Sequence, residues 1–237
     1  MGQAVSGELK GVQAWPTMFF TRRWSSHAQY RDAIIAFLHS LRQQQKKAIE
    51  SGIAPGAKAA TGIYEGDFDL FTKENDALAT LVEFMRGSLA TAISVANDQR
   101  VPPQDIAIEF VDSWYHITND GGFHDAHLHH GCSWCGIFYL QLGDSGTRLG
   151  EGAPNGGSRF YSPITSGGGY RDFGNSYMSS TLDPPIEDGL LLLFPSFLLH
   201  SGLPYRGKQD RIVLAFNARA LIAASHPSTQ ASVVKKA

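Results

Sequence analysis

The chain has 237 residues, a formal net charge of −2, and 43% hydrophobic against 18% charged residues. This composition supports a sizeable core and argues against a disordered or linker protein, while the near-neutral charge gives no global attraction to nucleic acid or an anionic membrane. Two cysteines cannot provide a disulfide scaffold for a chain of this length, and uninterrupted apolar runs stay short of the roughly 18 residues that span a bilayer. We therefore expect a cytoplasmic protein.

Two helices are predicted in the first hundred residues. Ser25 and Ser26 offer an N-cap to a helical pattern that is stopped by Gly52. Thr72 is the expected cap of a second pattern, in which apolar residues repeat at helical spacing over 78–93. Both patterns favour amphipathic helices that cover one side of a larger structure.

From Pro102 onward the period changes from helical to alternating, and β-branched and aromatic residues become frequent. Helices followed by strands predict an α+β protein, mainly β, with a sandwich or barrel that the helices buttress. We expect one domain over 1–237, with a helical part over 1–100, a β core over 101–220 and a C-terminal tail over 221–237. The strand candidates are Ile106–Phe110, Trp114–His116, Trp134–Leu142, Ser158–Ser162, Gly189–Phe194 and Arg211–Ala218.

A glycine-rich segment interrupts the β half. Ten of the 25 glycines fall between Gly143 and Gly174, where no helical period is present. Such a segment is either a lid over a site or a solvent-exposed insertion, and both interpretations stay open. If the segment is a lid, some residues in or beside it would contact a substrate carboxylate on closure; otherwise they are surface residues. They are Arg159, Tyr161, Tyr170 and Arg171.

Histidines are the first chemical signal. Four of the nine lie within seven residues, and of these His127 and His129 would share one face of an extended strand and reach one ion. A third, His200, follows the apolar run Leu190–Phe194, where a buried histidine has to be neutral, hydrogen-bonded or bound to metal.

Arg211 follows His200 by 11 residues, beyond a turn-like segment. The turn would fold the arginine's strand back antiparallel to the histidine's strand and place a cation inside the barrel, deeper than the metal. An arginine among apolar neighbours requires an anion. A dicarboxylate that chelates the metal at one end would supply this anion at its other end.

At this point the chain resembles the Fe(II)- and 2-oxoglutarate-dependent oxygenases, in particular the branch with a His-x-His motif. The dipeptide Asp69-Leu70 before the second helix also fits this group. The elements of the resemblance, in order, are Trp114, Gly122, His127 with His129, Gly136 with Tyr139, Phe194-Pro195 with His200, Arg211, and Phe216-Asn217. The resemblance implies a double-stranded β-helix (jelly-roll, cupin-like) core.

The resemblance implies that His127 and His200 bind Fe(II), that Arg211 binds the distal carboxylate of 2-oxoglutarate, and that Tyr139 is a second contact to it. The superfamily generally has a carboxylate where this chain has His129. Three ligand sets stay open: three histidines, which we prefer; Asp125 in place of His129; or water in the third position with His129 outside the metal's ligands.

Two further residues, Trp114 and His116, are candidates for the wall of the substrate pocket. The expected activity is oxidation, most simply hydroxylation, of an unactivated C–H bond of a small molecule such as an amino acid or derivative, with Fe(II), 2-oxoglutarate and O2. We expect no nucleic-acid or membrane partner, and the sequence allows a homodimer. The alternatives are a three-histidine cupin-type dioxygenase without 2-oxoglutarate and a non-catalytic, metal-stabilised binding protein.

Overall fold

The computed structural model describes residues 17–51, 62–146, 154–163 and 180–222. Two long helices, α1 (His27–Glu50) and α2 (Asp76–Ala96), precede most of the strands, and two short 3-10 helices, η1 (Leu70–Thr72) and η2 (Pro103–Asp105), flank α2. The strands are β1 (Phe20–Arg23), β2 (Ile63–Glu65), β3 (Ile106–Thr118), β4 (Gly122–His127), β5 (Trp134–Gln141), β6 (Ser158–Tyr161), β7 (Thr181–Leu182), β8 (Leu190–Pro195), β9 (His200–Tyr205) and β10 (Arg211–Ile222).

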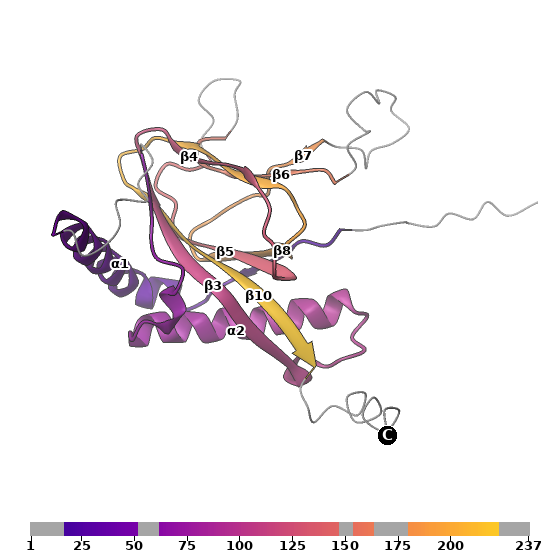
Figure 1. Ribbon diagram of the computed structural model, residues 1–237. Helices are drawn as coiled ribbons and strands as arrows, with labels where there is room; N and C mark the ends of the chain where they lie inside the picture. The colour runs from indigo at the N-terminus through magenta and orange to yellow at the C-terminus, as the bar shows by residue number, and fades with distance from the viewer. Residues whose placement is uncertain (1–16, 52–61, 147–153, 164–179, 223–237) are drawn as a thin grey trace, which may run out of the picture.

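The strands form two antiparallel sheets. The larger has six strands in the order β1-β8-β5-β10-β3-β2, and the smaller has four in the order β4-β9-β6-β7. Figure 1 shows the two sheets facing each other, with α1 and α2 on the outer side of the larger one. The described part of the chain is therefore a helix-buttressed, two-sheet β structure, as the sequence predicted.

Alternation along the strands of the larger sheet creates two apolar layers. In β5, Phe138 and Leu140 point toward the helices and join a cluster that includes Leu81 and Met85 of α2. Tyr139, between them, belongs to a second cluster that fills the space between the two sheets. The helices thus cover one face of the larger sheet, and its other face remains for the smaller sheet and the site.

The helix boundaries differ in part from the prediction. The first helix has Ser26 at its N-cap position and ends just before Gly52, as expected. The second is not capped by Thr72, which lies in η1. Asn75 is the cap instead, and its side-chain oxygen accepts a hydrogen bond of 2.9 Å from the backbone N–H of Leu78. Both asparagine and threonine can cap a helix, and the sequence pattern alone favoured the wrong one.

The predicted pairing of the strands that carry His200 and Arg211 is wrong. His200 begins β9 in the smaller sheet, whereas Arg211 begins β10 in the larger sheet, between β3 and β5. After β9 the chain crosses from one sheet to the other instead of making a hairpin. The imidazole and the guanidinium therefore belong to opposite walls of the space between the sheets.

Among the described helices, α2 is long and apolar enough to cross a membrane by length and composition. Its apolar side chains pack in the protein core, where Leu78, Leu81, Met85 and Leu89 are buried in the cluster beneath the larger sheet. The apolar character of α2 thus follows from its position as a core helix.

Replacing Leu81 with alanine tests this packing. Leu81 is fully buried, so the L81A variant leaves a cavity between α2 and the larger sheet, and we expect a loss of about 2–5 kcal/mol in the free energy of unfolding. Denaturant unfolding measures the loss. The control is L221A, at a side chain that is 58% exposed, which should change the stability little. Equal losses in the two variants would contradict the assignment of α2 to the core.

Candidate metal centre

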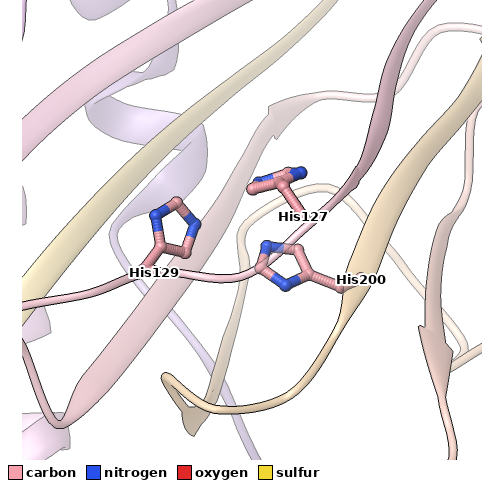
Figure 2. A group of neighbouring side chains, drawn as sticks. All are labelled: His127, His129 and His200. Carbon is pink, nitrogen blue, oxygen red and sulfur yellow. The ribbon is translucent and has the colours of Figure 1, made fainter.

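Three histidines meet at the inner side of the smaller sheet. His127, the last residue of β4, is directly opposite His200, the first residue of β9, in the antiparallel register. The ring centroid of His127 lies 4.3 Å from that of His200 and 4.9 Å from that of His129. One nitrogen from each ring lies within 4.8 Å of the others, and Figure 2 shows the three rings turned toward one another.

His129 reaches this position by a different route from the expected one. The strand β4 ends at His127, so His127 and His129 do not share a face of one strand. The chain leaves the strand, and the backbone N–H of His129 donates to the carbonyl of Ser196, which precedes β9 (3.3 Å). This contact places the His129 ring beside His200, with centroids 5.2 Å apart.

Hydrogen bonds orient two of the three rings for metal binding. Nδ1–H of His127 donates to the carbonyl of Asp125 (2.6 Å), and Nδ1–H of His200 donates to the carbonyl of Leu198 (2.9 Å). With the proton on Nδ1, the lone pair is on Nε2. A hydrogen bond from the distal ring nitrogen to a carbonyl is the usual support of a metal-bound histidine.

His129 has a different partner. The amide of Asn217 in β10 lies 3.3 Å from Nδ1 of His129 and donates to the carboxylate of Asp112, also at 3.3 Å. Coordination through Nε2 of His129 requires a proton on Nδ1, and Asn217 then has to turn its amide oxygen toward the ring. Asn217 therefore controls which nitrogen of His129 is available to a metal.

The site keeps the imidazoles of His129 and His200 neutral. Burial, together with the neighbouring histidines, lowers the pKa of His200 to about 3, and burial followed by the charge of His127 lowers the pKa of His129 to about 4. Neutral imidazole nitrogens suit Fe(II) as well as other first-row divalent ions. The donor atoms and their spacing thus fit an iron ion bound by His127, His129 and His200, once Asn217 presents its amide oxygen to the His129 ring.

Arg211 occupies the same pocket. The histidines and Arg211 line one pocket between the two sheets, and the Arg211 side chain is buried, with its guanidinium carbon 5.6 Å from the centre of the Tyr139 ring. Burial lowers the pKa of Arg211. Among the described residues its Nε has no hydrogen-bond partner, which is costly for a buried cationic group and indicates a place for an anion.

Two more buried polar atoms of β3 lack a hydrogen-bond partner within the described part of the chain. They are Nε1 of Trp114 and Oγ1 of Thr118. Thr118 is opposite Arg211 in the register of β3 and β10. Tyr139 is fully buried and donates its hydroxyl to Ser158 at 2.9 Å. Of these residues, Arg211, Trp114 and Ser158 line the pocket, which therefore offers a guanidinium, an indole N–H and a hydroxyl to an oxygen-rich ligand.

The other residues singled out from the sequence are distributed as follows. Trp114 and His116 line the pocket. Asp125 has an exposed side chain and belongs to no group of potential metal ligands in the described ranges. Arg159 makes a two-contact ion pair with Asp183 (2.8 and 2.6 Å), and the hydroxyl of Tyr161 lies 3.2 Å from that of Ser201.

Tyr170 and Arg171 lie outside the described residues, as does much of the glycine-rich segment. The strand β6 lies inside this segment and belongs to the smaller sheet, which confirms the strand predicted at Ser158–Ser162.

Sequence reasoning did not single out Thr118, Ser158 or Glu65. Thr118 could have been found by extending the alternation of Trp114 and His116 by one step along the same strand. Ser158 and Glu65 carried no local signal, because their positions depend on strand pairing between distant segments.

Residues 112–217 match the model of a family described as "Putative 2OG-Fe(II) oxygenase". The matched segment contains the three histidines and Arg211. The resemblance drawn from the sequence is thereby confirmed over this segment: residues 112–217 form the core of a 2-oxoglutarate-dependent oxygenase, an enzyme class whose cofactor and cosubstrates are Fe(II), 2-oxoglutarate and O2. None of the curated proteins compared matches the chain.

Solved structures with a similar fold include HygX from Streptomyces hygroscopicus with nickel and 2-oxoglutarate bound, at 12% identity, 86% coverage of this chain, 83% of that chain and a TM-score of 0.51. The epimerase SnoN in complex with Fe3+, alpha-ketoglutarate and nogalamycin RO is similar at 9% identity, with coverages of 86% and 81% and a TM-score of 0.51. A Pseudomonas putida prolyl-4-hydroxylase has 16% identity, coverages of 85% and 92% and a TM-score of 0.47. The likeness to HygX and SnoN confirms the predicted double-stranded β-helix fold.

The ligand assignment is tested by removing one imidazole. His200 is buried and oriented by Leu198, so we expect the H200A variant to bind one Fe(II) ion per chain fewer than the unaltered protein under anaerobic conditions, measured by equilibrium dialysis and metal analysis. The control is H130A, at an exposed neighbour of His129, which should bind iron like the unaltered protein. Undiminished iron binding by H200A would contradict the assignment.

The lowered histidine pKa values make the metal-free protein sensitive to mild acid. Below about pH 6.5 an unfolded chain protonates these histidines, whereas the folded chain keeps His200 and His129 neutral down to about pH 3 and 4. We therefore expect the free energy of unfolding to have its highest value above pH 6.5 and to decrease as the pH is lowered from 6.5 to 5. Urea unfolding at each pH measures it. The fall should be smaller in an H200Q variant; an equal fall would show that His200 does not contribute.

Proposed function

We propose that the protein hydroxylates an unactivated C–H bond of a small molecule, such as an amino acid or an amino-acid derivative. In this proposal Fe(II) is held by His127, His129 and His200, and 2-oxoglutarate by Arg211. The observation that carries the proposal is the buried Arg211, whose Nε has no partner among the described residues, in the same pocket as the three histidines.

The charges support a dicarboxylate in this pocket. Three neutral imidazoles leave the +2 charge of Fe(II) unreduced, whereas the usual carboxylate ligand would lower it to +1. The 2-oxo group and adjacent carboxylate of 2-oxoglutarate would bind at this charge, and the distal carboxylate would pair with the guanidinium of Arg211. A dianion thus balances positive groups at both ends of the pocket.

The groups around Arg211 suit the distal carboxylate. Thr118, across from Arg211 on β3, offers a buried hydroxyl. Tyr139 lies beneath the guanidinium, and its hydrogen bond to Ser158 fixes its hydroxyl at the pocket wall. Burial raises the pKa of Tyr139, so its hydroxyl stays protonated and keeps its hydrogen bond to Ser158.

When bound, the iron and its cosubstrates supply the oxidation, in which O2 oxidatively decarboxylates 2-oxoglutarate and one oxygen atom is inserted into the substrate. The protein's own contribution is positioning. The histidines hold the metal at one end of the pocket, Arg211 orients the cosubstrate from the other, and the two sheets keep bulk water away.

The substrate class rests on the form of the site. The pocket lies between two sheets and is lined by His116 and by Trp114, whose Nε1 has no partner among the residues that the structure describes. A net charge of −2 without a basic groove gives no support for a polynucleotide. An enclosed wall with isolated hydrogen-bonding groups suits a small polar molecule.

Replacing Arg211 with alanine tests the cosubstrate site. We expect the R211A variant to bind Fe(II) normally and to lose most 2-oxoglutarate-dependent CO2 release, by about 100-fold or more, because a buried charge pair is removed. The rate of CO2 release from labelled 2-oxoglutarate measures turnover, and metal analysis of the same samples measures bound iron.

The control for this experiment is R100A, because Arg100 is exposed at the surface, far along the chain from the site residues. It should turn over 2-oxoglutarate like the unaltered protein. Undiminished turnover by R211A would contradict the role of Arg211. Oxygen uptake that does not require 2-oxoglutarate would favour a three-histidine dioxygenase instead.

A further inference from the structure

A second group of potential metal ligands lies beside the three-histidine centre. It consists of Glu65 at the end of β2, His116 in β3 and His124 in β4. One ligand atom from each residue lies within 4.8 Å of the others. His116 and His124 also line the pocket that contains the first three histidines, so the group faces the site and not the outer surface.

The strand pairing brings these three side chains together. Glu65 is directly opposite His116 in the antiparallel register of β2 and β3. The chain then turns back through Asp120 (φ 52°) and Gly121 (φ 82°), and β4 returns with His124 beside His116, their ring centroids 5.2 Å apart. Each of the three ligands thus comes from a different strand at one edge of the two-sheet structure.

Two glycines hold this edge closed. Gly62 lies just before β2 and Gly122 begins β4, and a Cβ atom on Gly122 would lie 2.0 Å from the carbonyl oxygen of Gly62. Only glycine at this position lets the two backbones approach so closely. The close approach fixes β2, with Glu65, against the strand that carries His124.

The distances suit a metal after small side-chain rotations. Nε2 of His116 lies 2.9 Å from Oε2 of Glu65, and the third ligand atom is within 4.8 Å. Neighbouring ligands of a tetrahedral zinc with bonds of about 2.0–2.1 Å are roughly 3.3 Å apart. The His116–Glu65 contact would open by a few tenths of an ångström, and the His124 ring would move closer.

The donor types and their burial favour a cation. The side chains of His116 and Glu65 are 10% and 21% exposed, so much of the water around the carboxylate has been removed. Burial also keeps the His116 and His124 imidazoles neutral, with lowered pKa values. Two neutral imidazoles and one carboxylate form a common donor set for divalent zinc and iron.

We propose that Glu65, His116 and His124 form a second binding site for a divalent transition metal ion, adjacent to the three-histidine centre. The inference does not rest on the hydroxylase proposal, because it concerns metal binding by other residues. The ring centroids of His124 and His127 are 4.2 Å apart, so the two ions would be neighbours. The carboxylate of Glu65 lowers the charge at the second position and offsets part of their repulsion.

Zinc binding to the full-length, metal-free protein tests the proposal, because zinc is redox-inert and its binding does not depend on turnover. Equilibrium dialysis followed by metal analysis gives the number of ions per chain. We expect two for the unaltered protein and one for E65Q, in which the anionic ligand is replaced by a neutral group of the same size. The matched control is E109Q, at a half-exposed glutamate of β3, which should still bind two.

A second variant distinguishes the loss of a metal ligand from misfolding. His124 is only partly buried, so H124A should fold, which circular dichroism checks, and should also bind one zinc ion. Combining H200A with E65Q disables both sites, and we expect stoichiometric binding to disappear. One zinc ion per chain in the unaltered protein, or two in both E65Q and H124A, would overturn the second site. Loss of oxygenase activity in any variant would not bear on it.

Discussion

The site depends on a positive charge that is buried between two sheets. Arg211 starts the strand β10 in the middle of the larger sheet, and its guanidinium lies over the Tyr139 ring, out of contact with bulk water. A buried guanidinium whose Nε has no hydrogen-bond partner among residues 17–51, 62–146, 154–163 and 180–222 is unfavourable by itself. The fold keeps it there because helices cover the outer face of this sheet and leave its inner face free for a ligand.

The smaller sheet completes the arrangement from the other side. The pairing of β4 with β9 places His127 opposite His200, and the segment after β4 returns His129 to the same point. The three histidines and the arginine thus come from opposite walls, and a molecule with a chelating end and an anionic end can bridge the two walls. The carbonyls of Asp125 and Leu198 accept hydrogen bonds from the Nδ1–H groups of the two paired histidines. The Nε2 lone pairs of these histidines are then available to a metal.

Much of this could be predicted from the sequence, and the failures have physical causes. Helical spacing identified both helices, and alternation identified most of the larger sheet, because these signals are local. The pairing of the strands of His200 and Arg211 was predicted wrongly, because a turn-like segment does not reveal whether the chain stays in one sheet. His129 was placed on the strand of His127, although β4 ends at His127. The group around Glu65 was not found, because it depends on contacts between three separate strands.

The central claim is that the three histidines and Arg211 bind one iron ion and one 2-oxoglutarate molecule together. Anaerobic titration of the protein with Fe(II) and then 2-oxoglutarate tests this directly, because chelation of Fe(II) by the 2-oxo acid produces a weak charge-transfer band in the visible range. With Fe(II) at a saturating concentration, we expect the band to reach saturation at one equivalent of 2-oxoglutarate per chain. Absence of the band, with iron bound, would contradict the account.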